Sequence, residues 1–361
     1  MAVSDALVVG EDWISEHYFT TDATKESFLA RVLERRKEWE AEEKTGRPTV
    51  RSRFNGVRAQ LEELFAGLPS DSDDFFDDDA LPGTSPVSSD DSAGSASVVS
   101  SGDSTDSTSA ASSASPANSA SRANSTSQHR PITLGSTATA QADELTEQID
   151  ALLRDVLGYT TGEYELLARG PVTLVRPRGE EGPAPLALLQ ARSAATIEEL
   201  LNKNTAGSLR DPWVPLDLAD PAAPILEGAD ATDSVARALS ILLTDEHGPA
   251  FALVLAGRFA LIAEKERWPE GRWLAVDLQL VVERADTRRG GEVERALACL
   301  EARSLLPTAD GETWWAATLE DSAAHTVGVS QDLREGVRLS IEIIAGEVVR
   351  RRAAQGLEPL G

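Results

Sequence analysis

The chain has 361 residues, of which 41% are apolar, and its 60 acidic and 34 basic residues give a formal net charge of −26. This acidic excess argues against non-specific binding to nucleic-acid phosphates, because such binding depends on lysine and arginine. The single cysteine, Cys299, excludes an internal disulfide and a multi-cysteine metal site, and the four histidines have no metal-ligand spacing. Without a signal-peptide pattern or an apolar run of about 18 residues, we expect a cytoplasmic protein with no membrane segment.

Residues 1–68 are expected to form a helical arm. A first helix places Phe28, Val32 and Trp39 on one side and a run of charged residues on the other. A second helix, roughly 50–68, repeats the apolar spacing, so the two predict an αα-hairpin. The basic run of the first helix could touch phosphates, but a solvated face with pairs four residues apart is the simpler interpretation.

Residues 69–140 are expected to be a disordered acidic linker. Within 69–127 there are ten aspartates and one arginine, and serine, threonine and alanine make up most of the remainder. Such a composition cannot bury enough apolar surface to offset the entropy of ordering the chain.

An α/β domain is expected over 141–330, with a mixed sheet and flanking helices. Its first part reads as a helix at 143–157, strands at 164–167, 172–175 and 186–189, and helices at 197–202 and 234–243. The apolar runs 251–256 and 259–263 predict two buried strands. The alternation of apolar residues over 274–282 predicts a third.

The last part, 331–361, is expected to contain a long helix over 331–354. Five apolar residues at helical spacing predict a buried stripe along it. These residues are Leu333, Val337, Ile341, Ile344 and Val348.

The order helix, strand, strand, strand, helix over 143–202 is the skeleton of a PD-(D/E)XK nuclease core. Such a core binds a divalent metal with an acid on its second strand and an acid-x-Lys triplet on its third. Here the triplet is Gln190-Ala191-Arg192, and the second strand has no acid. Gln190 lacks the charge that magnesium prefers, and Arg192 stays protonated, so we expect a degenerate core without catalytic residues. An unrelated α/β arrangement accounts for the same order equally well.

Three further groups of charged residues are weaker candidates. Migrated metal ligands such as Glu163, Glu165 or Glu264 would give an active nuclease, although a charged turn explains Glu264 as well. Two basic clusters could contact DNA, while arginines at a helix C-terminus also suit the helix dipole. The candidate DNA contacts are Arg288, Arg289, Arg350, Arg351 and Arg352.

Four stretches of the sequence resemble the N-terminal region of large adenine-specific DNA methyltransferases of the type IIG restriction-modification and phage-defence kind. These stretches are WISEHYF with the helix to Trp39, LALLQAR at 186–192, residues 251–284 and residues 325–352. The resemblance implies a degenerate nuclease-type fold ahead of a methyltransferase domain, with DNA and that domain or subunit as partners.

The methyltransferase itself is not encoded in this sequence. It needs an (N/D)PPY motif for the flipped adenine and a Gly-rich loop for S-adenosylmethionine, and neither occurs here. We therefore expect no cofactor in this chain, and S-adenosylmethionine only in the missing domain. The alternative is a non-enzymatic adaptor that docks partners through its acidic linker.

Overall fold

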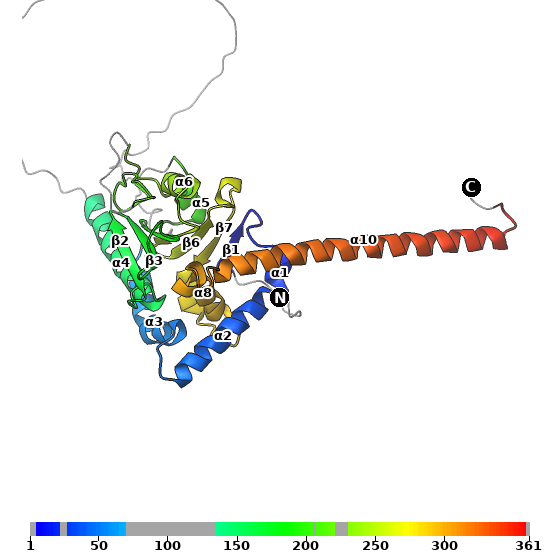
Figure 1. Cartoon of the computed structure of the whole chain (residues 1–361), viewed down its shortest axis with the longest axis horizontal. Helices are drawn as coiled ribbons and strands as arrows, with labels where there is room; N and C mark the ends of the chain where they lie inside the picture. Colours follow the sequence, from blue (N-terminus) through cyan, green and yellow to red (C-terminus); the bar gives the residue numbers. More distant parts are fainter. Residues whose placement is uncertain (1–4, 22–26, 70–133, 205–206, 221–229, 359–361) are drawn as a thin grey trace, which may run out of the picture. The chain divides into compact units, whose positions relative to one another are not determined.

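The computed structural model describes residues 5–21, 27–69, 134–204, 207–220 and 230–358. These residues form one seven-stranded mixed sheet, in the order β1-β7-β6-β5-β4-β3-β2, with helices around it (Figure 1). The expected α/β class with a mixed sheet and flanking helices is confirmed. Most of the expected linker lies outside the described residues. Helix α4, Leu134–Val156, begins before the expected linker boundary at residue 140.

The centre of the sheet consists of three apolar strands. These are β4 (Leu186–Gln190), β5 (Phe251–Ala256) and β6 (Phe259–Glu264). All six residues of β5 are buried. It pairs with β4 in parallel and with β6 in an antiparallel hairpin. An apolar run that is buried on both faces needs a covering layer on each side of the sheet.

One side of the sheet continues from β4 into a hairpin. Strand β3 (Val172–Pro177) pairs antiparallel with β4, and β2 (Tyr164–Arg169) forms the edge beyond it. Helix α4 precedes the hairpin. The parallel pairing of β4 with β5 requires a crossover, which contains α5 (Ile197–Leu201) and α6 (Val235–Thr244).

The N-terminus forms the other edge of the sheet. Strand β1 (Leu7–Gly10) pairs with β7 (Trp273–Asp277), and Leu7 lies opposite Val276. Residues 5–68 therefore share one compact unit with the sheet, where the sequence predicted a separate arm. Strand β1 was not predicted, because four residues are too few to show the alternation of apolar and polar residues that is typical of a strand.

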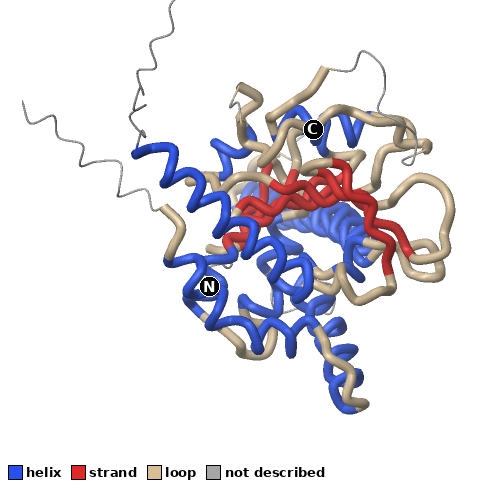
Figure 2. Tube along the Cα trace, turned by 90° about the vertical axis from the view of Figure 1, so that its left-hand side faces the viewer, coloured by secondary structure: helices blue, strands red, loops and turns tan. Residues whose placement is uncertain are grey.

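Two helical layers cover the two faces of the sheet (Figure 2). One core joins α4 and the sheet to the N-terminal and C-terminal helices. A second core, on the opposite face, contains α5, α6 and the loop around Trp213. The helices that join the first core are α1 (Glu16–Thr20), α2 (Phe28–Lys44), α3 (Val50–Ala66), α8 (Glu292–Leu300) and α9 (Ala302–Leu305).

The strand predicted over 274–282 ends at Asp277. Helix α7 (Leu278–Arg284) follows it directly. The Asp277 carboxylate accepts a hydrogen bond from the Leu280 backbone N–H at 3.0 Å, which caps the helix N-terminus. Leu278, Val281 and Val282 then face the core at helical spacing. The alternation was misleading because Leu278 and Val282, four residues apart, fall on one face of a strand and also on one face of a helix.

The final helix, α10, runs from Trp314 to Ala354 without a break. Its first turns pack into the core through Trp315 and Leu319. The predicted stripe is exposed, by 67% at Leu333 and 64% at Ile344, so the prediction of a buried stripe is wrong for this chain. Helical spacing identified the apolar face and gave no information about what covers it. No helix in the described part of the chain has the length and apolar character of a bilayer span.

We predict that Asp277→Ala lowers the free energy of unfolding by about 1–2 kcal/mol, because it removes the α7 cap. It also removes the ion pair between Asp277 and Arg258, whose atoms lie 2.6 Å apart. Asp277→Asn is the matched control, since asparagine caps a helix nearly as well as aspartate. Urea titration of the three proteins tests this, and equal stability of the alanine and asparagine variants would contradict it.

Candidate functional site at the end of strand β4

The residues of the predicted nuclease triplet lie where β4 ends. Gln190 is the last residue of the strand, and Ala191 forms an isolated bridge with Leu209. Backbone hydrogen bonds join Arg192 to Ser208 at 2.9 Å and Arg210 to Gln190 at 3.2 Å. The loop at 207–210 therefore lies directly against the triplet.

The guanidinium group of Arg154 faces the Gln190 side chain. With its side-chain oxygen towards α4, Gln190 accepts hydrogen bonds from both terminal nitrogens of Arg154, at 3.2 and 3.1 Å. Arg192 forms an ion pair with Asp143 of α4 at 3.3 Å, and it donates to the Gly207 carbonyl. Both candidate residues are thus held by α4 rather than directed at open solvent.

A buried contact between a carboxyl group and a guanidinium lies beside these residues. Asp150 of α4 has no exposed surface, and Arg210 donates to its Oδ2 atom at 2.8 Å. The other oxygen of Asp150 has no hydrogen-bond partner. Burial outweighs the attraction of Arg210 and raises the pKa of Asp150 to about 8.

A catalytic divalent metal does not fit this arrangement. The guanidinium groups of Arg154 and Arg210 already face Gln190 and Asp150, the two groups nearest to a nuclease ligand set. A cation at this point would meet fixed positive charge, and Gln190 would supply a neutral ligand. Among the described residues, no group of three histidine, cysteine or acidic side chains could hold a metal ion.

The migrated ligands that sequence analysis considered do not meet. Glu165, on β2, is paired with Arg176 at 2.7 Å. Glu264 ends β6, and burial raises its pKa. Three strands separate β2 from β6, so the axes of these two strands lie about 19 Å apart at the usual strand spacing. Glu163 precedes β2 and lies 3.9 Å from Arg303.

The candidate DNA contacts Arg288 and Arg289 lie in the loop between α7 and α8. Arg288 is bound through two nitrogens by Asp286, at 2.7 and 2.9 Å, and this contact lowers the pKa of Asp286 to about 2. Arg289 is exposed. Half or more of the charge of this cluster is therefore already compensated.

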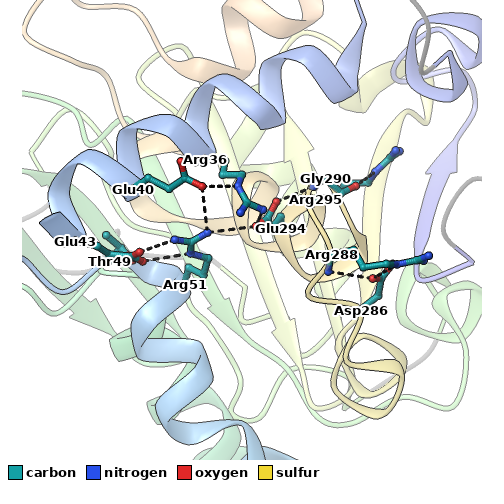
Figure 3. A network of polar contacts seen from close by, with 10 residues as sticks. All are labelled: Arg36, Glu40, Glu43, Thr49, Arg51, Asp286, Arg288, Gly290, Glu294 and Arg295. Carbon is teal, nitrogen blue, oxygen red and sulfur yellow. Dashed lines mark hydrogen bonds and ion pairs between the residues drawn. The ribbon is translucent and has the colours of Figure 1, made fainter.

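Beside this loop, a network of ion pairs clamps α2 and α3 to α8 (Figure 3). Glu294 of α8 is buried and accepts hydrogen bonds from Arg36 and Arg51 and from the Gly290 backbone N–H. Glu43 binds Arg51 from the other side. A cavity of about 320 Å³ lies next to these residues. Every carboxylate of the network has a cationic partner, so its evident role is structural.

A second buried carboxylate, Glu301, fixes α2 to the start of α9. It lies 2.8 Å from Arg35 and accepts from Trp39 Nε1 at 3.1 Å. Burial raises the pKa of Glu301 to about 7. Together with Glu294, it shows that the basic run of α2 faces buried acids, where sequence analysis favoured a solvated face.

The other basic cluster, Arg350–Arg352, occupies the last turns of α10. Glu347 forms ion pairs with both Arg350 and Arg351, at 2.6 and 2.7 Å. Arg352 donates to the carbonyl oxygen of Glu358. These arginines are far from the end of β4 in the sequence, and none of their hydrogen bonds or ion pairs joins them to it within the described part of the chain. The structure therefore brings neither basic cluster to the residues of the triplet.

The partners of the triplet on α4 were not predicted from the sequence. Asp143, Glu147, Asp150 and Arg154 follow one side of α4 at spacings of four, three and four residues. This stripe was visible, but charged residues on a helix are usually solvated. Only the pairing of the loop at 207–210 with β4 shows that Arg210 covers it.

Comparison with models of known protein families, with curated proteins and with solved structures finds no match for this chain.

We predict that Asp150 makes stability depend on pH. Its folded pKa of about 8 exceeds the ordinary value of 3.8, so the folded state binds more protons than the unfolded state between these values. The free energy of unfolding should therefore fall as pH rises through this window, by at most about 1.4 kcal/mol per pH unit from this group. Asp150→Asn should remove this contribution to the slope.

Asp155→Asn is the matched control, because Asp155 lies on the same helix and is exposed. Urea titrations at several pH values between 4 and 8 give the slopes. If Asp150→Asn and Asp155→Asn have the wild-type slope, Asp150 does not carry a raised pKa.

Proposed function

We propose that this chain is a DNA-handling module with a degenerate nuclease-type core, which supports an adenine-specific methyltransferase domain or subunit in phage defence. The order α4, β2, β3, β4 and α5 supports the nuclease-type part of the proposal. Strands β2, β3 and β4 are consecutive antiparallel neighbours in the sheet, so the segment forms one contiguous subdomain of the fold.

The observation that carries the proposal is the replacement of metal ligands by arginine contacts at the end of β4. The third-strand position contains Gln190 and Arg192, held by Arg154 and Asp143. The second strand contributes Thr173 and no acid. A core of this kind can support binding or assembly, and it lacks the paired carboxylates that metal-dependent hydrolysis requires.

The link to a methyltransferase rests on the resemblance of sequence. Two of the resembling stretches correspond to β5, β6, β7 and α7, and to most of α10. S-adenosylmethionine belongs to the methyltransferase domain in this proposal, and this chain contributes no residue to it.

The adaptor alternative is favoured by a different observation. Three of the five candidate DNA-contact arginines, Arg288, Arg350 and Arg351, are paired with carboxylates. Such pairing weakens attraction to phosphates. The aspartate-rich segment would then provide the docking charge, as a mimic of nucleic acid or as a partner site.

We predict that the purified chain does not cleave DNA with Mg²⁺ or Mn²⁺ and does not bind S-adenosylmethionine. A supercoiled plasmid assay and isothermal titration measure the two properties. Gln190→Ala is the matched variant for cleavage. Metal-dependent nicking that this variant abolishes would overturn the degenerate-core proposal, and micromolar binding of S-adenosylmethionine would overturn the assignment of the cofactor to another domain.

We also predict that deletion of residues 72–133 strengthens binding to duplex DNA at low salt. The deletion removes nine aspartates and two arginines, so it removes net negative charge that repels phosphates. Fluorescence anisotropy with a labelled duplex measures the affinity. Arg289→Ala should weaken binding, while Arg338→Ala should not, because Glu335 and Glu342 already neutralise Arg338.

If neither the full chain nor the deletion variant binds the duplex, the adaptor function is favoured over the DNA-handling module.

A further inference from the structure

The second half of α10 exposes an unusual amount of apolar surface. Every described side chain from Val327 to Ala354 is exposed or half-buried, and this part of the helix extends away from the sheet (Figure 1). Its large exposed apolar residues are Val327, Leu333, Val337, Leu339, Ile341, Ile343, Ile344, Val348 and Val349. Exposed apolar surface of this extent marks an interaction surface.

The sequence of this half does not favour an isolated helix. Gly328, Gly336 and Gly346 lie within it, and each costs about 1 kcal/mol relative to alanine. Most of its apolar residues are β-branched valine or isoleucine, which also lower helix propensity. Long helices in proteins are stabilised mainly by packing of an apolar face. This half of α10 therefore needs a partner.

The exposed stripe continues the face that packs into the core. At 100° per residue, Leu333, Val337, Ile341, Ile344 and Val348 fall within one 80° sector of the helix. Trp315 and Leu319, which are buried in the core, fall in the same sector. The domain thus covers the first turns of the stripe and leaves the remainder uncovered.

We propose that α10 forms an antiparallel pair with α10 of a second copy of this chain. When two copies of the stripe are placed antiparallel, their apolar residues lie opposite one another. Leu333 faces the second copy's Val348, and Val337 faces the second copy's Ile344. Both pairs follow from one register, so two identical helices bury their stripes together without a gap. Binding of a helix from a different protein would not require the stripe to match its own antiparallel copy.

The position of the domain selects the antiparallel orientation. Because the domain packs on the stripe side of α10 at its start, two parallel helices would bring two domains into the same space. In the antiparallel register, the end of one helix at Ala354 reaches Val327 of the other, where the domain begins. The two helices then pair along the whole exposed part of α10, from Val327 to Ala354.

Charge supports the same orientation. A cavity of about 570 Å³ at the start of the exposed half is lined by Val327 together with Asp12 and Glu16. The cavity's arginines, Arg267 and Arg272, are already paired with Glu264 and Glu270 at 3.6 and 3.0 Å. The surplus charge of this cavity is therefore acidic.

The antiparallel register places the last turn of the second copy's α10 beside this acidic cavity. Arg352 of that turn donates to the carbonyl oxygen of Glu358 and is paired with no carboxylate among the described residues, so its charge is available to the cavity.

The stripe alone gives an interface at the small end of the specific range. Its five side chains are between 39% and 67% exposed in one copy, so they bury at most about 100 Å² each, or at most about 500 Å² per copy. The total of at most about 1,000 Å² only reaches the lower limit for specific interfaces, so contacts at the cavity must add to it.

Sedimentation of the full chain tests the proposal, with Ile344→Glu as the disrupting variant. We expect a wild-type dimer at micromolar concentration and a dissociation constant at least about tenfold weaker for Ile344→Glu, since it buries a charge. Leu339→Glu is the matched control, because Leu339 is exposed on the opposite side of α10, and it should remain dimeric. An unchanged unfolding transition of the domain shows that the variants fold.

Cysteine cross-linking tests the orientation. The native Cys299 is buried, so an introduced thiol on α10 is the accessible one. A mixture of Leu333→Cys and Val348→Cys chains should form a heterodimeric disulfide, whereas neither variant alone should cross-link with itself.

A wild-type chain that is monomeric at 100 µM (about a hundredfold above a micromolar dissociation constant) overturns the proposal. So does equal dissociation of the Leu339→Glu and Ile344→Glu variants, which would place the contact elsewhere. Self-cross-linking of Leu333→Cys overturns the antiparallel orientation.

Discussion

The complete burial of β5 is the constraint on which the rest of the structure depends. A strand that is apolar along its whole length can pair with β4 and β6 only if both faces of the sheet are covered. One cover is the crossover between β4 and β5, which the parallel pairing requires in any case. The other cover is assembled from both ends of the chain. The placement of α4, and of the contacts at the end of β4, follows from this second cover.

Buried polar pairs hold the helices of the second cover together. Arg35 and Arg36 of α2 reach Glu301 and Glu294, at the start of α9 and within α8, and Arg210 of the loop at 207–210 reaches Asp150 of α4. Loss of one member of such a pair leaves an uncompensated buried charge, which is more costly than the pair itself is stabilising. These contacts fix how the helices are placed, and at β4 they also place arginine where a nuclease would bind metal.

The fold class and most elements could be predicted from the sequence, because the apolar runs of β4, β5 and β6 and the stripe of α4 leave few other interpretations. The limits have physical causes. Leu278 and Val282 satisfy both the strand period and the helix period, and the Asp277 cap distinguishes the helix. The helical spacing of residues likewise identified the apolar face of α10 and the charged face of α2. It did not show which segment packs against each face, because that segment lies far away in the sequence.

The same limit applies to the candidate site. Gln190 and Arg192 could be found from the order of elements, whereas Arg154 and Arg210 could not. Their proximity depends on the return of the loop at 207–210 to the end of β4, which no local pattern in the sequence encodes.

The pairing of Leu7 with Val276 has a consequence for synthesis of the protein in the cell. Strand β1 is synthesised before the other six strands of the sheet, and its partner β7 is synthesised last. During that interval the aromatic residues that follow β1 have no core to enter, so the nascent chain exposes them. Contacts between segments so far apart in the chain also slow folding. Production of this protein should therefore depend on chaperone capacity and translation rate more than its final packing would suggest.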